Sequence, residues 1–138
     1  MKKKILIIDD DISLKPLWEY VLSQHFLDAE IDWHIDIETA KQQYLKQKKT
    51  STPYSLMIVD LFLSGAETGL DFLLFLQKKQ ETCPLLFVSA VDAAKLKEEM
   101  ARFSLYCHVV EKPLQSHNLE KILQKMTTDG RTLEVDYD

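Results

Sequence analysis

Residues 5–11 have the sequence Ile5-Leu6-Ile7-Ile8-Asp9-Asp10-Asp11, in which four apolar residues run directly into three acidic ones. A continuous run of branched apolar residues is typical of a strand that is covered on both faces, as strands of parallel sheets are. The change from apolar to acidic marks the end of that strand. We therefore expect a buried strand over 5–8 that delivers carboxylates to one edge of a parallel sheet.

The rest of the chain repeats this alternation of strand-like and helix-like patterns. The further predicted strands are 30–36, where polar and apolar residues alternate as at a half-exposed edge, 56–59, 85–88 and 106–110. Apolar residues at helical spacing predict helices over 14–26, 37–45, 70–76, 96–103 and 119–126, and Ser13 is the candidate N-cap of the first. Strand and helix alternate five times without room for hairpins. This order predicts an α/β fold, a doubly wound, five-stranded parallel sheet covered by helices on both faces.

Length and charge support a single soluble domain. The 138 residues fall within the usual size of one domain, about 100–200 residues. Seventeen basic against 22 acidic residues leave a net charge of −5, which disfavours direct binding to nucleic acid or to an anionic membrane. The apolar run after the N-terminal lysines is shorter than the apolar core of a signal peptide, which has about 7–15 residues. We therefore expect a cytoplasmic protein.

Polar groups follow the strands that are predicted to be buried. They are Asp9-Asp10-Asp11, Asp60, Ser89 and Lys112. The carboxyl ends of parallel strands share one edge of the sheet, and ligands bind beyond that edge. Carboxylates gathered there repel one another unless a cation lies among them, either a bound divalent ion or the Lys112 ammonium. Oxygen ligands from Asp9, Asp10 and Asp60, without nearby sulfur or imidazole, suit a hard ion such as Mg²⁺.

A magnesium site of this kind favours phosphoryl chemistry. Mg²⁺ commonly bridges a protein carboxylate to a phosphate, and phosphoryl transfer mainly requires that the group be positioned and its charge neutralised. A carboxylate can itself accept a phosphoryl group as an acyl phosphate, with Ser89 and Lys112 as further contacts. Taken alone, Asp9-Asp10-Asp11 is equally consistent with simple helix capping, because an acidic group at a helix N-terminus contributes about 0.3–1 kcal/mol.

These four motifs, in this order, resemble the receiver domain of bacterial two-component response regulators over about residues 3–126. The resemblance implies a flavodoxin-like receiver fold with strand order 2-1-3-4-5. It makes Asp60 the phosphoacceptor and assigns Ser89 and Lys112 to the phosphate. It implies Mg²⁺ or Mn²⁺ as cofactor, held by Asp9, Asp10, Asp60 and the main-chain carbonyl of Phe62.

The same resemblance describes partners and domain limits. The phosphoryl donor would be a phosphohistidine on a sensor histidine kinase or a histidine phosphotransfer protein. Phosphorylation would switch binding to an output protein or domain through about residues 92–126. We expect a receiver domain over 1–126, with 127–138 as a C-terminal tail or the start of a linker. Such a domain is a signalling phosphoacceptor rather than an enzyme, and the sequence names neither its kinase nor its output partner.

The sequence departs from the family pattern at several positions. Val109 stands where the family usually has a switch aromatic, and the loop after Asp60 is one residue longer than usual, with Ser64 where a proline is common. The positions that tune dephosphorylation in the family are Phe62 and Val91 here. Both are apolar and offer no polar side chain to an attacking water, so we expect a longer-lived phosphoryl group than in fast chemotaxis-type regulators.

Two other functions are consistent with parts of the pattern. Asp9, Asp11 and Ser13 resemble the nucleophile motif of haloacid-dehalogenase-like phosphatases, but that family needs a second acidic pair after the lysine, and Asp60 would then have no role. The second alternative is a pseudo-receiver that binds a partner without being phosphorylated.

Overall fold

The computed structural model describes residues 3–61, 63, 65–90 and 107–129, and it contains one five-stranded parallel sheet. The strand order is β2-β1-β3-β4-β5, as the resemblance implied. The strands are β1 (Lys4–Ile8), β2 (Glu30–His34), β3 (Tyr54–Asp60), β4 (Leu85–Ser89) and β5 (Cys107–Glu111). The predicted doubly wound α/β fold is therefore confirmed.

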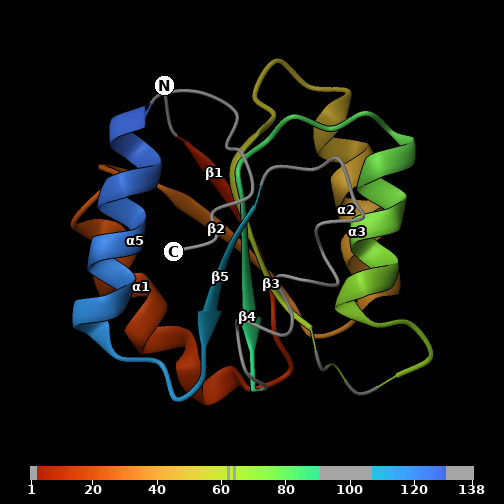
Figure 1. Ribbon diagram of the computed structural model, residues 1–138. Helices are drawn as coiled ribbons and strands as arrows, with labels where there is room; N and C mark the ends of the chain where they lie inside the picture. Colours follow the sequence, from red (N-terminus) through yellow and green to blue (C-terminus); the bar gives the residue numbers. More distant parts are fainter. Residues whose placement is uncertain (1–2, 62, 64, 91–106, 130–138) are drawn as a thin grey trace.

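Helices cover both faces of this sheet (Figure 1). On one face lie α1 (Lys15–Ser23) and α5 (Ser116–Asp129), and on the other lie α2 (Ile37–Lys48) and α3 (Gly69–Lys78). A short 3₁₀ helix, η1 (Ile12–Leu14), precedes α1. The helix predicted over 96–103 lies outside the described residues.

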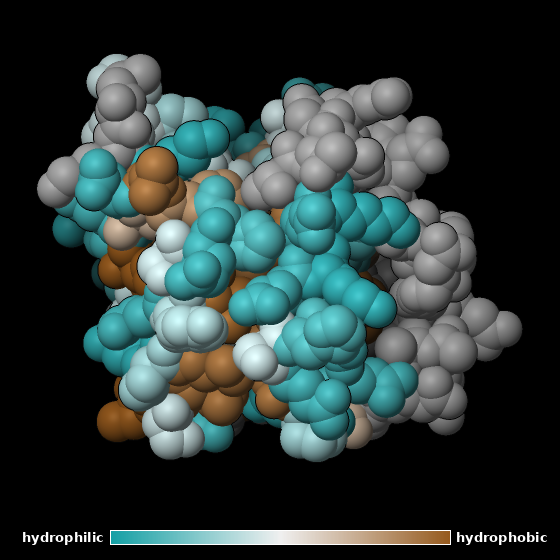
Figure 2. Space-filling view, turned by 90° about the vertical axis from the view of Figure 1, so that its left-hand side faces the viewer, coloured by the Kyte–Doolittle hydropathy of each residue, from teal (hydrophilic) through white to brown (hydrophobic). Residues whose placement is uncertain are grey.

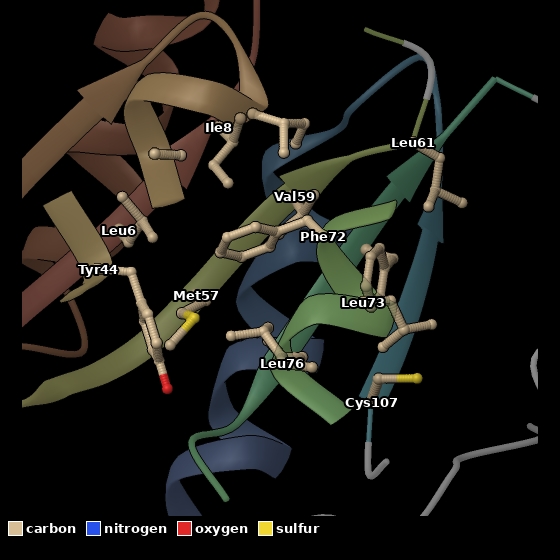
Figure 3. Packing of buried hydrophobic residues seen from close by; sticks show 14 of the residues in the cluster. Leu6, Ile8, Tyr44, Met57, Val59, Leu61, Phe72, Leu73, Leu76 and Cys107 are labelled. Atoms are coloured by element: carbon tan, nitrogen blue, oxygen red, sulfur yellow. The ribbon is translucent and has the colours of Figure 1, made fainter. Parts of the chain in front are cut away.

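Two apolar cores explain why the central strands are apolar at every position. Successive side chains of β1 point to opposite faces, so Ile5 and Ile7 pack under α1 and α5, whereas Leu6 and Ile8 pack under α2 and α3. All four are fully buried. Figure 3 shows the second of these cores, with Leu6 and Ile8 close to side chains of α2 and α3. Each fully buried aliphatic side chain contributes about 1.5–3 kcal/mol relative to an exposed one.

The N-termini of the helices differ from the prediction in one case. Ser13 is not the N-cap of α1, because residues 12–14 first form η1 and Leu14 occupies the cap position without a side-chain hydrogen bond. The Asp11 carboxylate caps η1 instead, by accepting from the Ser13 amide at 3.1 Å.

The strand β2 ends at His34 rather than at residue 36, and Asp36 instead caps α2 by accepting a hydrogen bond from the Thr39 amide at 2.8 Å. At the other end of the chain, α5 continues to Asp129, three residues beyond the last apolar residue of its stripe, Met126.

The face formed by α1 and α5 is mostly hydrophilic, with hydrophobic areas visible between the polar side chains (Figure 2). The large apolar side chains that are exposed on and beside α1 are Ile12, Tyr20 and Leu27. Among the described residues, no helix is long and apolar enough to cross a membrane.

Candidate functional site

The carboxyl ends of β1, β3, β4 and β5 lie at one edge of the sheet, at the bottom of Figure 1. Asp9 directly follows β1, Asp60 is the last residue of β3, Ser89 is the last residue of β4, and Lys112 directly follows β5. Parallel register aligns these ends, because Asp60 pairs with Val88 and Ser89 with Glu111. The predicted convergence of strand-end groups is what the parallel sheet produces.

An ammonium group lies between two buried carboxylates. Lys112 Nζ is 3.0 Å from Asp60 Oδ2, where it donates a hydrogen bond, and 3.9 Å from Asp9 Oδ2. The two carboxylate side chains are 3% exposed, compared with 26% for Lys112. Charge-assisted hydrogen bonds of this kind are strong, and they offset part of the cost of taking the charges out of water.

Three carboxylates meet at the same point. One oxygen atom each from Asp9, Asp10 and Asp60 lies within 4.8 Å of the others, and the described residues contain no second group of three potential metal ligands. Asp10 is exposed, whereas the other two are buried, so the cluster opens to solvent on one side. Three hard oxygen ligands with room for waters fit Mg²⁺ or Mn²⁺.

The protonation of Asp9 reflects this crowding. The pKa of Asp9 is raised from 3.8 to about 6, and burial is the largest cause. The Asp11 amide and the Lys112 ammonium lower this pKa, whereas the neighbouring carboxylates of Asp60 and Asp10 raise it. Burial opposes the charge of Lys112 as well. Its hydrogen bond to Asp60 and the negative charges around it nevertheless raise its pKa above the usual 10.5, so Lys112 is cationic at neutral pH.

The backbone of the acidic loop, residues 9–11, forms hydrogen bonds with residues of β2. The Asp9 amide donates to the His34 carbonyl at 2.9 Å, and the Trp33 indole Nε1 donates to the Asp9 carbonyl at 3.0 Å. Within the loop, the Asp11 amide donates to Asp9 Oδ1 at 2.9 Å. Sequence reasoning missed Trp33, because an aromatic residue in an alternating edge strand carries no signal that its ring nitrogen reaches a loop on another strand.

Gly69 was also missed. A Cβ atom at this position would lie 2.6 Å from the Asp60 main-chain oxygen and 2.8 Å from Leu61 Cα, so only glycine allows α3 to begin this close to Asp60. The helix start is reinforced by a capping box between Thr68 and Asp71. A threonine and a glycine before an apolar helix, with Asp71 at the third helical position, were the available signal.

The remaining predicted residues divide into those the structure describes and those it does not. Ser89 is fully buried, and its carbonyl accepts a hydrogen bond from the Lys112 amide at 2.7 Å, which joins the ends of β4 and β5. Val109, at the switch position, is half-buried against the core under α2 and α3. Phe62 and Val91 lie outside the described residues.

Comparisons with known proteins agree with this arrangement. Residues 5–124 match the response regulator receiver domain family. The chain is 28% identical over 130 residues to the sensory transduction protein LytT of Bacillus subtilis (strain 168), covering 94% of this chain and 50% of LytT, so it spans about half the length of that relative.

Two solved structures show the same fold. The receiver domain of NtrX from Brucella abortus has a TM-score of 0.69 at 22% identity, covering 88% of this chain and 95% of that one. The response regulator DrrB from Thermotoga maritima has a TM-score of 0.74 at 12% identity, covering 96% and 55%. With the family match extending over nearly all of the sheet and its helices, the chain belongs to the response regulator receiver domain family of two-component signalling.

Proposed function

We propose that Asp60 is the phosphoacceptor of a two-component phosphorelay. The observation that carries this proposal is the placement of Lys112 Nζ 3.0 Å from Asp60 Oδ2, beside a cluster of three carboxylate oxygens. In the proposed step, Asp60 attacks the phosphorus atom of a phosphohistidine on a sensor histidine kinase or histidine phosphotransfer protein. The P–O bond of an acyl phosphate forms, the P–N bond breaks, and the imidazole leaves with the bonding pair.

The metal ligands in this proposal are Asp9, Asp10, Asp60 and the main-chain carbonyl of Phe62, and the ion is Mg²⁺ or Mn²⁺. When bound, such an ion neutralises charge on the phosphoryl oxygens. Lys112 holds the Asp60 carboxylate before transfer and pairs with a phosphoryl oxygen afterwards. Ser89 supplies its hydroxyl to another of these oxygens.

Phosphorylation would act on the rest of the domain through Lys112 and Ser89. The Lys112 amide donates a hydrogen bond to the Ser89 carbonyl, so a movement of either residue affects the ends of both β4 and β5. We place the surface that binds an output protein or domain within about residues 92–126, of which β5 and α5 are described. The receiver would extend beyond the predicted boundary at 126 to the end of α5 at Asp129, with a tail or the start of a linker after it, and would act in the cytoplasm as a signalling phosphoacceptor.

The proposed phosphoryl group is long-lived. Phe62 and Val91 occupy the positions that tune hydrolysis in this family, and neither side chain can orient an attacking water by a hydrogen bond. Decay of the acyl phosphate in Mg²⁺ should therefore be slower than in fast chemotaxis-type regulators. A lifetime of seconds would contradict this part of the proposal.

Small phosphoryl donors test the proposal without a cognate kinase. The chain is incubated with acetyl phosphate or phosphoramidate and Mg²⁺, and its intact mass is measured. One phosphoryl adduct is expected, lost in Asp60→Asn but retained in Asp11→Asn, which makes the same chemical change in a neighbouring exposed aspartate.

Two outcomes would favour the alternatives. Turnover of a phosphomonoester that depends on Asp9 would identify a haloacid-dehalogenase-like phosphatase. A chain that folds but forms no adduct would be a pseudo-receiver that only binds a partner.

A further inference from the structure

The acidic loop accepts a side-chain hydrogen bond from the edge strand β2. Trp33 Nε1 donates to the main-chain carbonyl of Asp9 at 3.0 Å, across 24 residues of sequence. This carbonyl belongs to the peptide that joins Asp9 to Asp10, two of the three clustered carboxylates. The contact therefore acts on the backbone that carries the candidate metal ligands.

Strand register explains how the indole reaches this carbonyl. In the pairing of β1 with β2, Ile7 lies opposite Trp33 and Ile8 lies opposite His34, so Asp9 follows one position later. The indole ring is half-buried and packs against the core under α1 and α5. Its body is thus fixed by apolar contacts while its N–H points along the strands towards the loop.

Both backbone groups of Asp9 are consequently held by neighbouring residues of β2. Its amide donates to the His34 carbonyl, and its carbonyl accepts from Trp33. Because a peptide unit is planar, fixing the Asp9 carbonyl also fixes the direction of the Asp10 amide. Asp10 is exposed, and this peptide plane determines the position at which its side chain leaves the backbone.

We propose that Trp33 is a positioning residue for the acidic loop, which carries the proposed metal ligands Asp9 and Asp10. Its indole N–H sets the plane of the Asp9–Asp10 peptide and so holds two carboxylates in a geometry suited to one divalent cation. The inference rests on the proposed function in that it assumes a metal at Asp9, Asp10 and Asp60. Hydrogen-bond partners outside the ligand shell typically change metal affinity by about 10–100-fold. Because Trp33 bonds to the main chain rather than to a ligand atom, we expect about tenfold, the lower limit of that range.

The two tryptophans of the chain provide a matched pair of variants. Trp33→Phe removes the hydrogen bond to the loop and keeps an aromatic ring. Trp18→Phe makes the same change in a fully buried residue whose indole N–H has no hydrogen-bond partner among the described residues. Mn²⁺ binding to the full chain is measured from the concentration of free Mn²⁺, determined by electron paramagnetic resonance, and thermal unfolding is followed in parallel.

The expected result is a Kd for Mn²⁺ about tenfold higher in Trp33→Phe and changed less than twofold in Trp18→Phe, whatever each variant does to the unfolding temperature. An unchanged Kd in Trp33→Phe overturns the inference and leaves the proposed function intact. If the wild-type chain binds no Mn²⁺, the metal site and this inference both fail.

A second measurement needs no substitution at Trp33. The ¹⁵N-labelled wild-type chain has two indole N–H resonances, which Trp18→Phe assigns. The Trp33 resonance should move during a Mg²⁺ titration and saturate together with the backbone amides of Asp9 and Asp10, while the Trp18 resonance stays in place. A Trp33 resonance that does not respond while those amides do contradicts the inference, even where Trp33→Phe fails to fold.

Discussion

At the scale of single residues, Asp9 has to satisfy two opposing requirements. The proposed role of Asp9 as a metal ligand requires an ionised carboxylate, but Asp9 is 2% exposed and its pKa is raised to about 6, with burial as the largest cause. The unfolded chain binds the proton less tightly, with a pKa of 3.8. Ionised Asp9 therefore destabilises the metal-free fold, and the free energy of unfolding decreases as the pH rises from about 4 to about 6.

Asp9→Asn should consequently stabilise the metal-free protein at neutral pH. We expect a gain of about 1–3 kcal/mol in the free energy of unfolding at pH 7.5 and little change at pH 4, where Asp9 is protonated and resembles asparagine. Urea unfolding with a chelator present measures both values. Glu19→Gln, the same change of a carboxylate to an amide at an exposed residue of α1, should change neither. If Asp9→Asn were no more stable than the wild type at pH 7.5, the raised pKa would be wrong.

At the scale of secondary structure elements, the start of α3 sets the position of Asp60. Gly69 is the first residue of this helix, and a Cβ there would overlap the Asp60 main chain at 2.6 Å. Gly69→Ala should therefore displace either α3 or the end of β3. We expect a loss of about 1–3 kcal/mol in unfolding free energy, as for other overpacked sites, together with slower phosphorylation by acetyl phosphate.

The control for this variant lies on the same helix. Leu74 is 41% exposed, so Leu74→Ala should change phosphorylation little. Urea unfolding and the initial rate of adduct formation, measured on both variants, separate a general loss of helix stability from a displaced Asp60. Equal phosphorylation rates for wild type and Gly69→Ala would show that α3 does not position Asp60, the proposed phosphoacceptor.

Element positions were largely predictable because their signals are local. The apolar run before Asp9 and the helical stripes depend on neighbouring residues, and each predicted strand and helix within the described residues is present. The cap of the first helix was not predictable in this way. Ser13 has the right residue type, but Asp11 takes the capping role once residues 12–14 form a 3₁₀ turn.

At the scale of the whole molecule, the convergence of Asp9, Asp60 and Lys112 followed from topology alone, because parallel strands place their carboxyl ends at one edge. The contacts that support this cluster could not be inferred in the same way. The hydrogen bond from Trp33 to the Asp9 carbonyl and the close approach of Gly69 to Asp60 depend on packing between separate elements. Sequence patterns describe which face a residue occupies, but not the atom that its side chain reaches.

The carboxylate cluster also links metal binding to global stability. Three carboxylates and one ammonium leave the site with excess negative charge, and burial makes their repulsion strong. A divalent cation binds the folded chain but finds no preformed site in the unfolded one. At a concentration ten times its Kd, Mg²⁺ should therefore increase the free energy of unfolding by about 1.4 kcal/mol.

For a chain of this size, that gain corresponds to a rise of about 3–6 °C in the unfolding temperature. Scanning calorimetry across a Mg²⁺ titration measures it, with NaCl at matched ionic strength to separate specific binding from charge screening. Asp10→Asn should reduce the rise, because it removes the exposed one of the proposed ligands without disturbing the buried pair of Asp60 and Lys112, whereas Asp11→Asn should retain it. An equal rise in NaCl and MgCl₂ would mean that the carboxylates respond to ionic strength and do not form a metal site.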